Sequence, residues 1–193
     1  AARRTRRASE RGQRRRARCV TSTSARRVHA SIPVKIQVIA VGATRTPYVQ
    51  AGLHDYLGRL RGPRAVEWLE VKAEPGDRPD GRAREAERIL ARVPAGTTLV
   101  RLDERGEELT SEAFAARIAG WQASGTRVLS FVIGGAYGFD PAVASRAGFT
   151  VSLSKMTFPH ELVRVIFVEQ LYRAFQILDG TGYHHGGAPH RSG

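Results

Sequence analysis

Three glycines in the last third of the chain have a spacing that suits ligand binding. Gly134, Gly135 and Gly138 follow the apolar run 128–133. Glycines at the carboxyl end of a buried parallel strand let the backbone approach a ligand, although an ordinary strand-ending turn uses them equally well. The spacing is not that of the dinucleotide-binding fingerprint, which has a glycine, one residue, a second glycine, two residues and a third glycine.

A histidine and an arginine that follow this turn also have types suited to chemistry. His160 and Arg164 stand at i and i+4 in a helix that Pro159 begins, and this spacing places both on one helix face. A histidine at a helix start more often makes a local hydrogen bond than acts as a catalyst. Together with the glycines, the pair indicates a ligand site between a strand-ending turn and a helix start.

The elements that must position these residues alternate between strands and helices. Apolar runs predict strands and apolar residues at helical spacing predict helices. Strands are expected at 34–41, 65–71, 97–102, 128–133 and 150–153. Helices are expected at 46–60, 83–93, 110–123 and from Pro159 to about Gly180, with a turn at 104–108 and a short polar connection before the fifth strand. This alternation predicts an α/β fold with a parallel sheet flanked by helices.

The last of these helices is apolar nearly all round between Leu162 and Val168. One face of a sheet cannot cover such a helix, so it must be buried in a larger core or in a subunit interface. The sequence favours an obligate dimer, with interface residues expected among Val165, Ile166, Phe167 and Leu171.

Several longer motifs carry a specific resemblance. They are KIQVIAVG and TPYVQAGLHDYLGRL near the start, LVRLDERGEELTSEAFA in the middle, and IGGAYGF, SLSKMTFPHELVRV, EQLYRAF and Tyr183-His184 towards the end. In this order they resemble the ribosomal RNA large subunit methyltransferase H family of the SPOUT superfamily, over about 34–185.

The resemblance implies a homodimeric enzyme with a C-terminal trefoil knot in its parallel sheet, and the knot follows from the resemblance alone. It implies S-adenosylmethionine as the cofactor and methylation of ring N3 of a pseudouridine in a stem-loop of large-subunit ribosomal RNA, free or in the assembled ribosome. The sulfonium methyl is already a good electrophile, so no metal is expected. Positioning of the methyl and removal of the ring N–H proton are the tasks left to the protein.

The resemblance also assigns site residues, all at strand ends, in loops or near the helix start. The cofactor contacts fall on Leu102, Gly134, Leu153, Ser154, Lys155, Met156, Thr157 and Phe158. The catalytic and RNA-contacting candidates are His160, Arg164, Tyr183 and His184. His185 stands where the family usually has Arg or Lys, which leaves one expected basic contact without its residue.

Two other classes of function compete with this interpretation. A catalytically silent rRNA-binding assembly factor would keep the fold and the basic surface, but it would not need the glycine turn and the 154–158 loop. A nucleotide-binding oxidoreductase would need the glycine fingerprint and an acidic residue that reads the ribose, and the sequence has neither.

Charge is spread unevenly along the 193 residues, whose formal net charge is +13. Residues 1–30 hold 11 Arg and one acidic residue, whereas the rest holds 20 basic and 17 acidic residues, a balance of only +3. No run of 18 apolar residues exists, so a membrane partner is not expected. The single cysteine, Cys19, makes an intramolecular disulfide impossible, and no Cys/His cluster has zinc spacing.

The basic N-terminal segment is expected to stay outside the folded domain, because it has almost no large apolar residues. We expect three parts: an Arg/Ser-rich arm at 1–31, the methyltransferase domain at 32–185 and a flexible tail at 186–193. The arm has the composition of a transit peptide, which favours a chloroplast location, with the mitochondrial matrix or a bacterial cytoplasm as alternatives. An RNA-binding arm and an overextended gene start are the competing interpretations of the arm itself.

Overall fold

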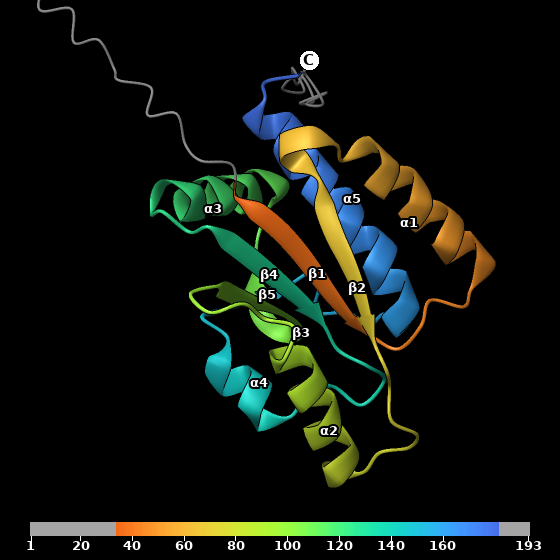
Figure 1. The fold of residues 1–193 in the computed structure, drawn as a ribbon. Coiled ribbons are helices and arrows are strands. Elements are labelled where there is room, and N and C mark those ends of the chain that lie inside the picture. The colour runs from red at the N-terminus through yellow and green to blue at the C-terminus, as the bar shows by residue number, and fades with distance from the viewer. Residues whose placement is uncertain (1–33, 182–193) are drawn as a thin grey trace, which may run out of the picture. The chain divides into compact units, whose positions relative to one another are not determined.

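The structure is a computed structural model that describes residues 34–181 (Figure 1). Five parallel strands form its sheet, in the order β2-β1-β4-β3-β5. They are β1 (Lys35–Val41), β2 (Val66–Val71), β3 (Thr98–Glu108), β4 (Val128–Ile133) and β5 (Phe149–Ser152). The helices are α1 (Pro47–Arg59), α2 (Pro79–Leu90), α3 (Ser111–Ala123), α4 (Pro141–Arg146) and α5 (His160–Leu178), with a short 3₁₀ turn at Gly62–Arg64. The expected α/β class with a parallel sheet is confirmed, whereas the knot remains a prediction.

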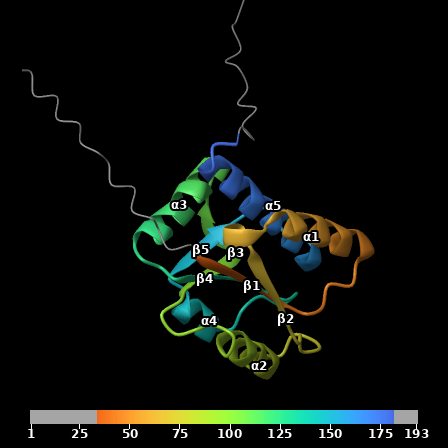
Figure 2. The same cartoon turned by 45° about the horizontal axis from the view of Figure 1, so that its top comes forward.

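Helices cover both faces of the sheet, which explains why the central strands are apolar throughout (Figures 1 and 2). One face packs against α1, α3 and α5, and the other packs against α2 and α4. Alternate residues of β1 divide between the two cores: Ile36 and Val38 belong to the first, and Ile39 and Val41 to the second.

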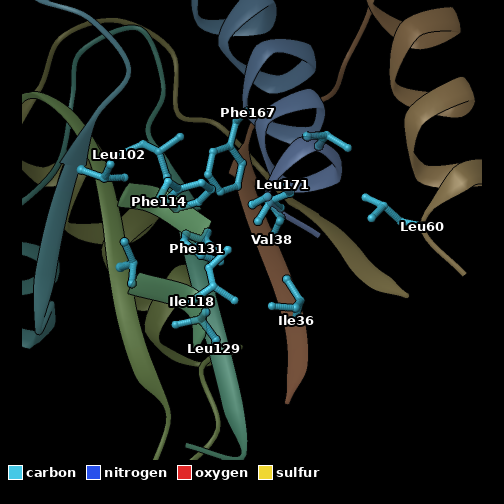
Figure 3. Packing of buried hydrophobic residues seen from close by; sticks show 14 of the residues in the cluster. Ile36, Val38, Leu60, Leu102, Phe114, Ile118, Leu129, Phe131, Phe167 and Leu171 are labelled. Atoms are coloured by element: carbon cyan, nitrogen blue, oxygen red, sulfur yellow. The ribbon is translucent and has the colours of Figure 1, made fainter. Parts of the chain in front are cut away.

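Helix α5 lies between α1 and α3 and supplies much of the larger core (Figures 1 and 2). The Phe167 ring packs 4.8 Å from the Phe131 ring and 6.2 Å from the Phe114 ring, measured between centroids, and Leu171 is likewise fully buried (Figure 3). The expectation that Phe167 and Leu171 form a subunit interface is therefore wrong. The sheet and two neighbouring helices of the same chain already cover them, while Val165 and Ile166 stay half-buried.

The segment 104–108, expected to be a turn, continues strand β3. Val151 of β5 is in register with Leu102 and again with Glu107, so residues 103–106 loop out and bring the chain back to the same point of β5. Gly106 makes this return possible, because a Cβ there would lie 2.6 Å from the carbonyl carbon of Val151. Sequence periodicity did not indicate this second pairing because two strand residues are too few to show a pattern.

Two helices also differ from expectation, one because it is present at all and the other in where it begins. Helix α4 occupies the expected polar connection; Asp140 caps it by accepting a hydrogen bond from the Ala142 N–H at 2.8 Å, and Pro141 takes its first position. Helix α2 begins at Pro79 rather than at residue 83, again with proline in the first turn.

Candidate functional site

A cavity of about 740 Å³ lies at the carboxyl ends of β3, β4 and β5. Three stretches of chain form its wall: residues 101–105 after the first part of β3, residues 133–139 after β4, and residues from β5 to the first turn of α5. Ligands of open α/β sheets bind at this end of the strands. The structure therefore has a cavity where the glycine turn and the helix start predict a ligand site.

Most of the expected cofactor residues lie on the cavity wall. Those that line it are Leu102, Gly134, Leu153, Ser154, Met156, Thr157 and Phe158. Lys155 does not line it; its side chain is exposed, and its ammonium nitrogen lies 3.7 Å from a carboxylate oxygen of Glu108. Seven of the eight thus come together from three separate strand ends.

The glycine turn is tight and closely packed. The Gly138 N–H donates to the Gly135 carbonyl oxygen at 3.2 Å, and Gly138 has a φ of +76°, which favours glycine. A Cβ on Gly134 would lie 3.2 Å from the Phe139 ring, and one on Gly135 would lie 3.1 Å from a methyl group of Val41. A side chain at either position would push the turn away from its neighbours, so the glycines fix the shape of the cavity wall.

The loop between β5 and α5 is held in shape by its own serines. The Ser152 hydroxyl donates to the Ser154 carbonyl oxygen at 2.9 Å, and the Ser154 hydroxyl accepts from the Met156 N–H at 2.9 Å. Met156 itself is 72% exposed, which is unusual for an apolar side chain. The loop thus presents an apolar side chain at the cavity mouth.

Several further polar residues of the cavity wall, Arg101, Asp103 and Tyr137 among them, were not predicted from the sequence. Arg101 lies beside Asp103, with nitrogen and oxygen 3.7 Å apart, and its guanidinium carbon is 5.7 Å from the Phe139 ring centroid. Its Nε is buried without a hydrogen-bond partner. Arg101 and Asp103 flank Leu102 at a strand end, so their positions in the sequence could have indicated that they belong to the site. Tyr137, half exposed at the tip of the glycine turn, was also missed.

His160 and Arg164 do not share the site, although they are one helical turn apart. His160 is exposed and lines the cavity together with Pro159 and Val163. Arg164 is fully buried outside the cavity wall, where its guanidinium donates to the Thr44 hydroxyl at 2.6 Å and to the Val41 carbonyl oxygen at 2.7 Å. Four residues rise about 6 Å along the helix axis, and over this distance α5 passes from the cavity wall into the core. In this chain Arg164 therefore has no direct contact with the cavity.

The remaining expectations concern the C-terminal residues, metal binding and membrane association. Tyr183, His184 and His185 lie outside the described residues. Among residues 34–181, no group of three or more His, Cys, Asp or Glu is placed to hold a metal ion. Within the same range no helix is long and apolar enough to cross a membrane.

Comparison with known proteins shows which family the chain belongs to. Residues 34–184 match the family described as "Predicted SPOUT methyltransferase". The ribosomal RNA large subunit methyltransferase H of Geotalea uraniireducens is 42% identical over 79% of this chain and 100% of its own length. The proteins of the same name from Pelobacter propionicus and Acetivibrio thermocellus are 46% and 41% identical over 79% and 78% of this chain, covering 100% and 99% of their own lengths.

The chain belongs to the SPOUT methyltransferases and, within them, to the ribosomal RNA large subunit methyltransferase H family. A solved structure, the SpoU methyltransferase AviRb from Streptomyces viridochromogenes in complex with AdoMet, shows a weaker likeness. Its TM-score is 0.41 at 15% identity, over 74% of this chain and 58% of that chain. This likeness is too distant to inform the site.

Proposed function

We propose that this protein methylates large-subunit ribosomal RNA, with S-adenosylmethionine as the methyl donor and ring N3 of a pseudouridine in a stem-loop as the acceptor. The observation that carries the proposal is the convergence of Leu102, Gly134 and the 153–158 loop on one cavity. Relatives named for this class of enzyme match the chain across almost their whole length.

The cavity wall fits such a cofactor. A volume of about 740 Å³ falls within the range of small-molecule sites. Leu102, Leu153 and Phe158 offer apolar contacts for an adenine ring, while Arg101 and Asp103 supply opposite charges for a zwitterionic amino-acid group. When bound, the cofactor would supply an electrophilic methyl group; the protein orients it and excludes water.

His160 is the described residue best suited to the proton on the pseudouridine ring. It is exposed and lies on the cavity wall at the start of α5. An imidazole accepts and donates protons readily, which a general base for the ring N–H requires. Arg164, which is buried against Thr44, is not in a position to do this.

The expected contribution of Tyr183 and His184, which lie outside the described residues, is proposed to come from a second subunit. Helix α5 runs from His160 at the cavity to Leu178, a length of about 27 Å at 1.5 Å per residue. Tyr183 and His184 follow Leu178 by five and six residues, and six residues span at most about 21 Å when fully extended. The helix thus carries the chain away from its own cavity before Tyr183 and His184 are reached, which supports a homodimer in which each tail completes the partner's site.

RNA binding at this site would use basic residues around the cavity. Arg105 lines the cavity, and Lys155 is exposed next to it. Such residues position an RNA backbone by contacting phosphates, while the cavity selects the base. The folded part of the chain carries little net charge, so we expect binding to depend on local basic residues.

Methyl transfer to defined ribosomal RNA tests the proposal. We would incubate the purified protein with S-adenosylmethionine and ribosomes from a bacterial strain that lacks the family enzyme, and locate the new methyl group by mass spectrometry of RNA digests. One methylated pseudouridine in large-subunit RNA is the expected result. The matched control is Gly134→Val, whose branched side chain would enter the Phe139 contact and distort the cavity. RNA binding without any cofactor binding or methylation would instead support a silent assembly factor.

A further inference from the structure

The first turn of α5 makes contacts in two directions. Pro159, His160 and Val163 lie on the cavity wall. Glu161 and Arg164, three residues apart and so neighbours on the helix surface, instead contact the 42–46 loop, which connects β1 to α1. The turn that borders the cavity is therefore attached to the 42–46 loop by two charged side chains.

Glu161 holds the start of α1. One of its carboxylate oxygens accepts from the Thr46 N–H at 2.8 Å and from the Arg45 N–H at 3.1 Å. Thr46 is the N-cap residue of α1, and its own side chain makes no capping bond. In a capping box, a glutamate of the same helix accepts the N-cap amide; here a glutamate from a distant helix does so. The hydrogen bond from Thr46 is the main reason that the pKa of Glu161 is lowered.

Arg164 holds the same loop from its inner side. Its guanidinium donates to the Thr44 hydroxyl, which in turn donates to a carboxylate oxygen of Glu70 at 2.6 Å. The second terminal nitrogen of the guanidinium donates to the carbonyl oxygen of Val41, the last residue of β1. Burial lowers the pKa of Arg164, while the carboxylates of Glu70 and Glu161 oppose that shift. Removing any partner would leave a buried charge poorly compensated.

We propose that Glu161 and Arg164 are positioning residues for the cofactor site. They fix the first turn of α5 against the 42–46 loop and thereby hold Pro159, His160 and Val163 at the cavity wall. Neither Glu161, Arg164 nor Thr44 lines the cavity. Any effect of these residues on cofactor affinity must therefore pass through the position of the turn. The inference rests on the proposed function for the identity of the cofactor.

Binding of S-adenosylhomocysteine, the demethylated product, measured by calorimetry tests this role. Glu161→Ala and Thr44→Val should each raise the Kd by about tenfold or more, because each removes two hydrogen bonds to a charged group. Glu161→Gln, which keeps an acceptor oxygen, should bind nearly as well as the wild type. The matched control is Phe175→Leu, which alters the buried far end of the same helix. It should lower Tm by a similar amount and leave the Kd within about twofold. Equal affinities in all four variants, or equal weakening in the control, would overturn the proposal.

Hydrogen exchange without ligand separates this inference from the proposed function. The Val163 N–H donates to the Pro159 carbonyl oxygen at 3.2 Å and reports directly on the first turn. Its exchange should be faster in Glu161→Ala than in Phe175→Leu when each is measured at the same interval below its own Tm. If the wild type fails to bind S-adenosylhomocysteine, the cofactor assignment is wrong, and this exchange comparison still decides the positioning role. Indistinguishable exchange in the two variants would reject it.

Discussion

Phe131 on β4 and Phe167 on α5 pack with their ring centroids 4.8 Å apart (Figure 3). The two rings join the strand that leads into the glycine turn to the helix that begins at His160. The cavity lies between the ends of these two elements, so the core contact also sets the distance between two of its walls.

Replacing Phe167 by alanine should destabilise the folded subunit itself. The side chain is fully buried among other aromatic rings, and Phe→Ala changes in such cores lower the free energy of unfolding by about 3–5 kcal/mol. Urea denaturation followed by circular dichroism would measure the loss. Tyr48→Ala is the control, because Tyr48 is 66% exposed and should change stability by less than about 0.5 kcal/mol. A monomer of normal stability would contradict the core assignment and return Phe167 to a subunit interface.

Gly106 should not tolerate even a methyl group. An added Cβ would lie 2.8 Å or less from three backbone atoms of residues 150–152, which cannot move as a flexible side chain would. Gly106→Ala should lower the free energy of unfolding by about 1–3 kcal/mol, as overpacking does, and weaken cofactor binding through β5. Gly120→Ala, on an open helix surface with no atom near the added Cβ, provides the comparison in the same thermal melts. Equal melting temperatures for the two variants would mean that the second pairing of β3 with β5 is looser than described.

The contribution of Glu161 to stability should depend on pH in one direction. Hydrogen bonds from Thr46 lower the pKa of Glu161 in the folded state. A carboxyl group with a lowered pKa stabilises the protein above its unfolded pKa, and this stabilisation is lost as pH falls through the folded pKa. The Tm difference between wild type and Glu161→Gln should therefore be largest at neutral pH and shrink below about pH 4. A difference that stays constant from pH 7 to pH 3 would mean that the charge of Glu161 does not matter.

A shortened chain that begins at Ser31 should fold and bind the cofactor as the full chain does. The basic arm holds almost no large apolar residues, so it contributes little to a core. Thermal melts and S-adenosylhomocysteine titrations of the two chains would be compared side by side. A fall of several degrees in Tm on shortening would show that the arm is structural and would count against a transit peptide.

The sequence indicated the general fold and most of the cavity for clear physical reasons. The apolar runs of β1 and β4 indicate strands covered on both faces, and the glycines after Ile133 indicate a close backbone approach. The role of Arg164 could not be foreseen in this way. Its spacing from His160 gives a direction on the helix but not the acceptors at Thr44 and Val41, which come from a strand end more than a hundred residues earlier.

The double pairing of Val151 also bears on aggregation. Strand β5 is last in the sheet order, and an unpaired edge strand is a template on which another chain can add. Strand β5 is only four residues long, and β3 pairs with it a second time through the charged residues Glu107 and Glu108; short edge strands, bulges and charged residues disfavour such addition. The loop that brings the cavity wall together thus also protects the sheet from growing into a larger one.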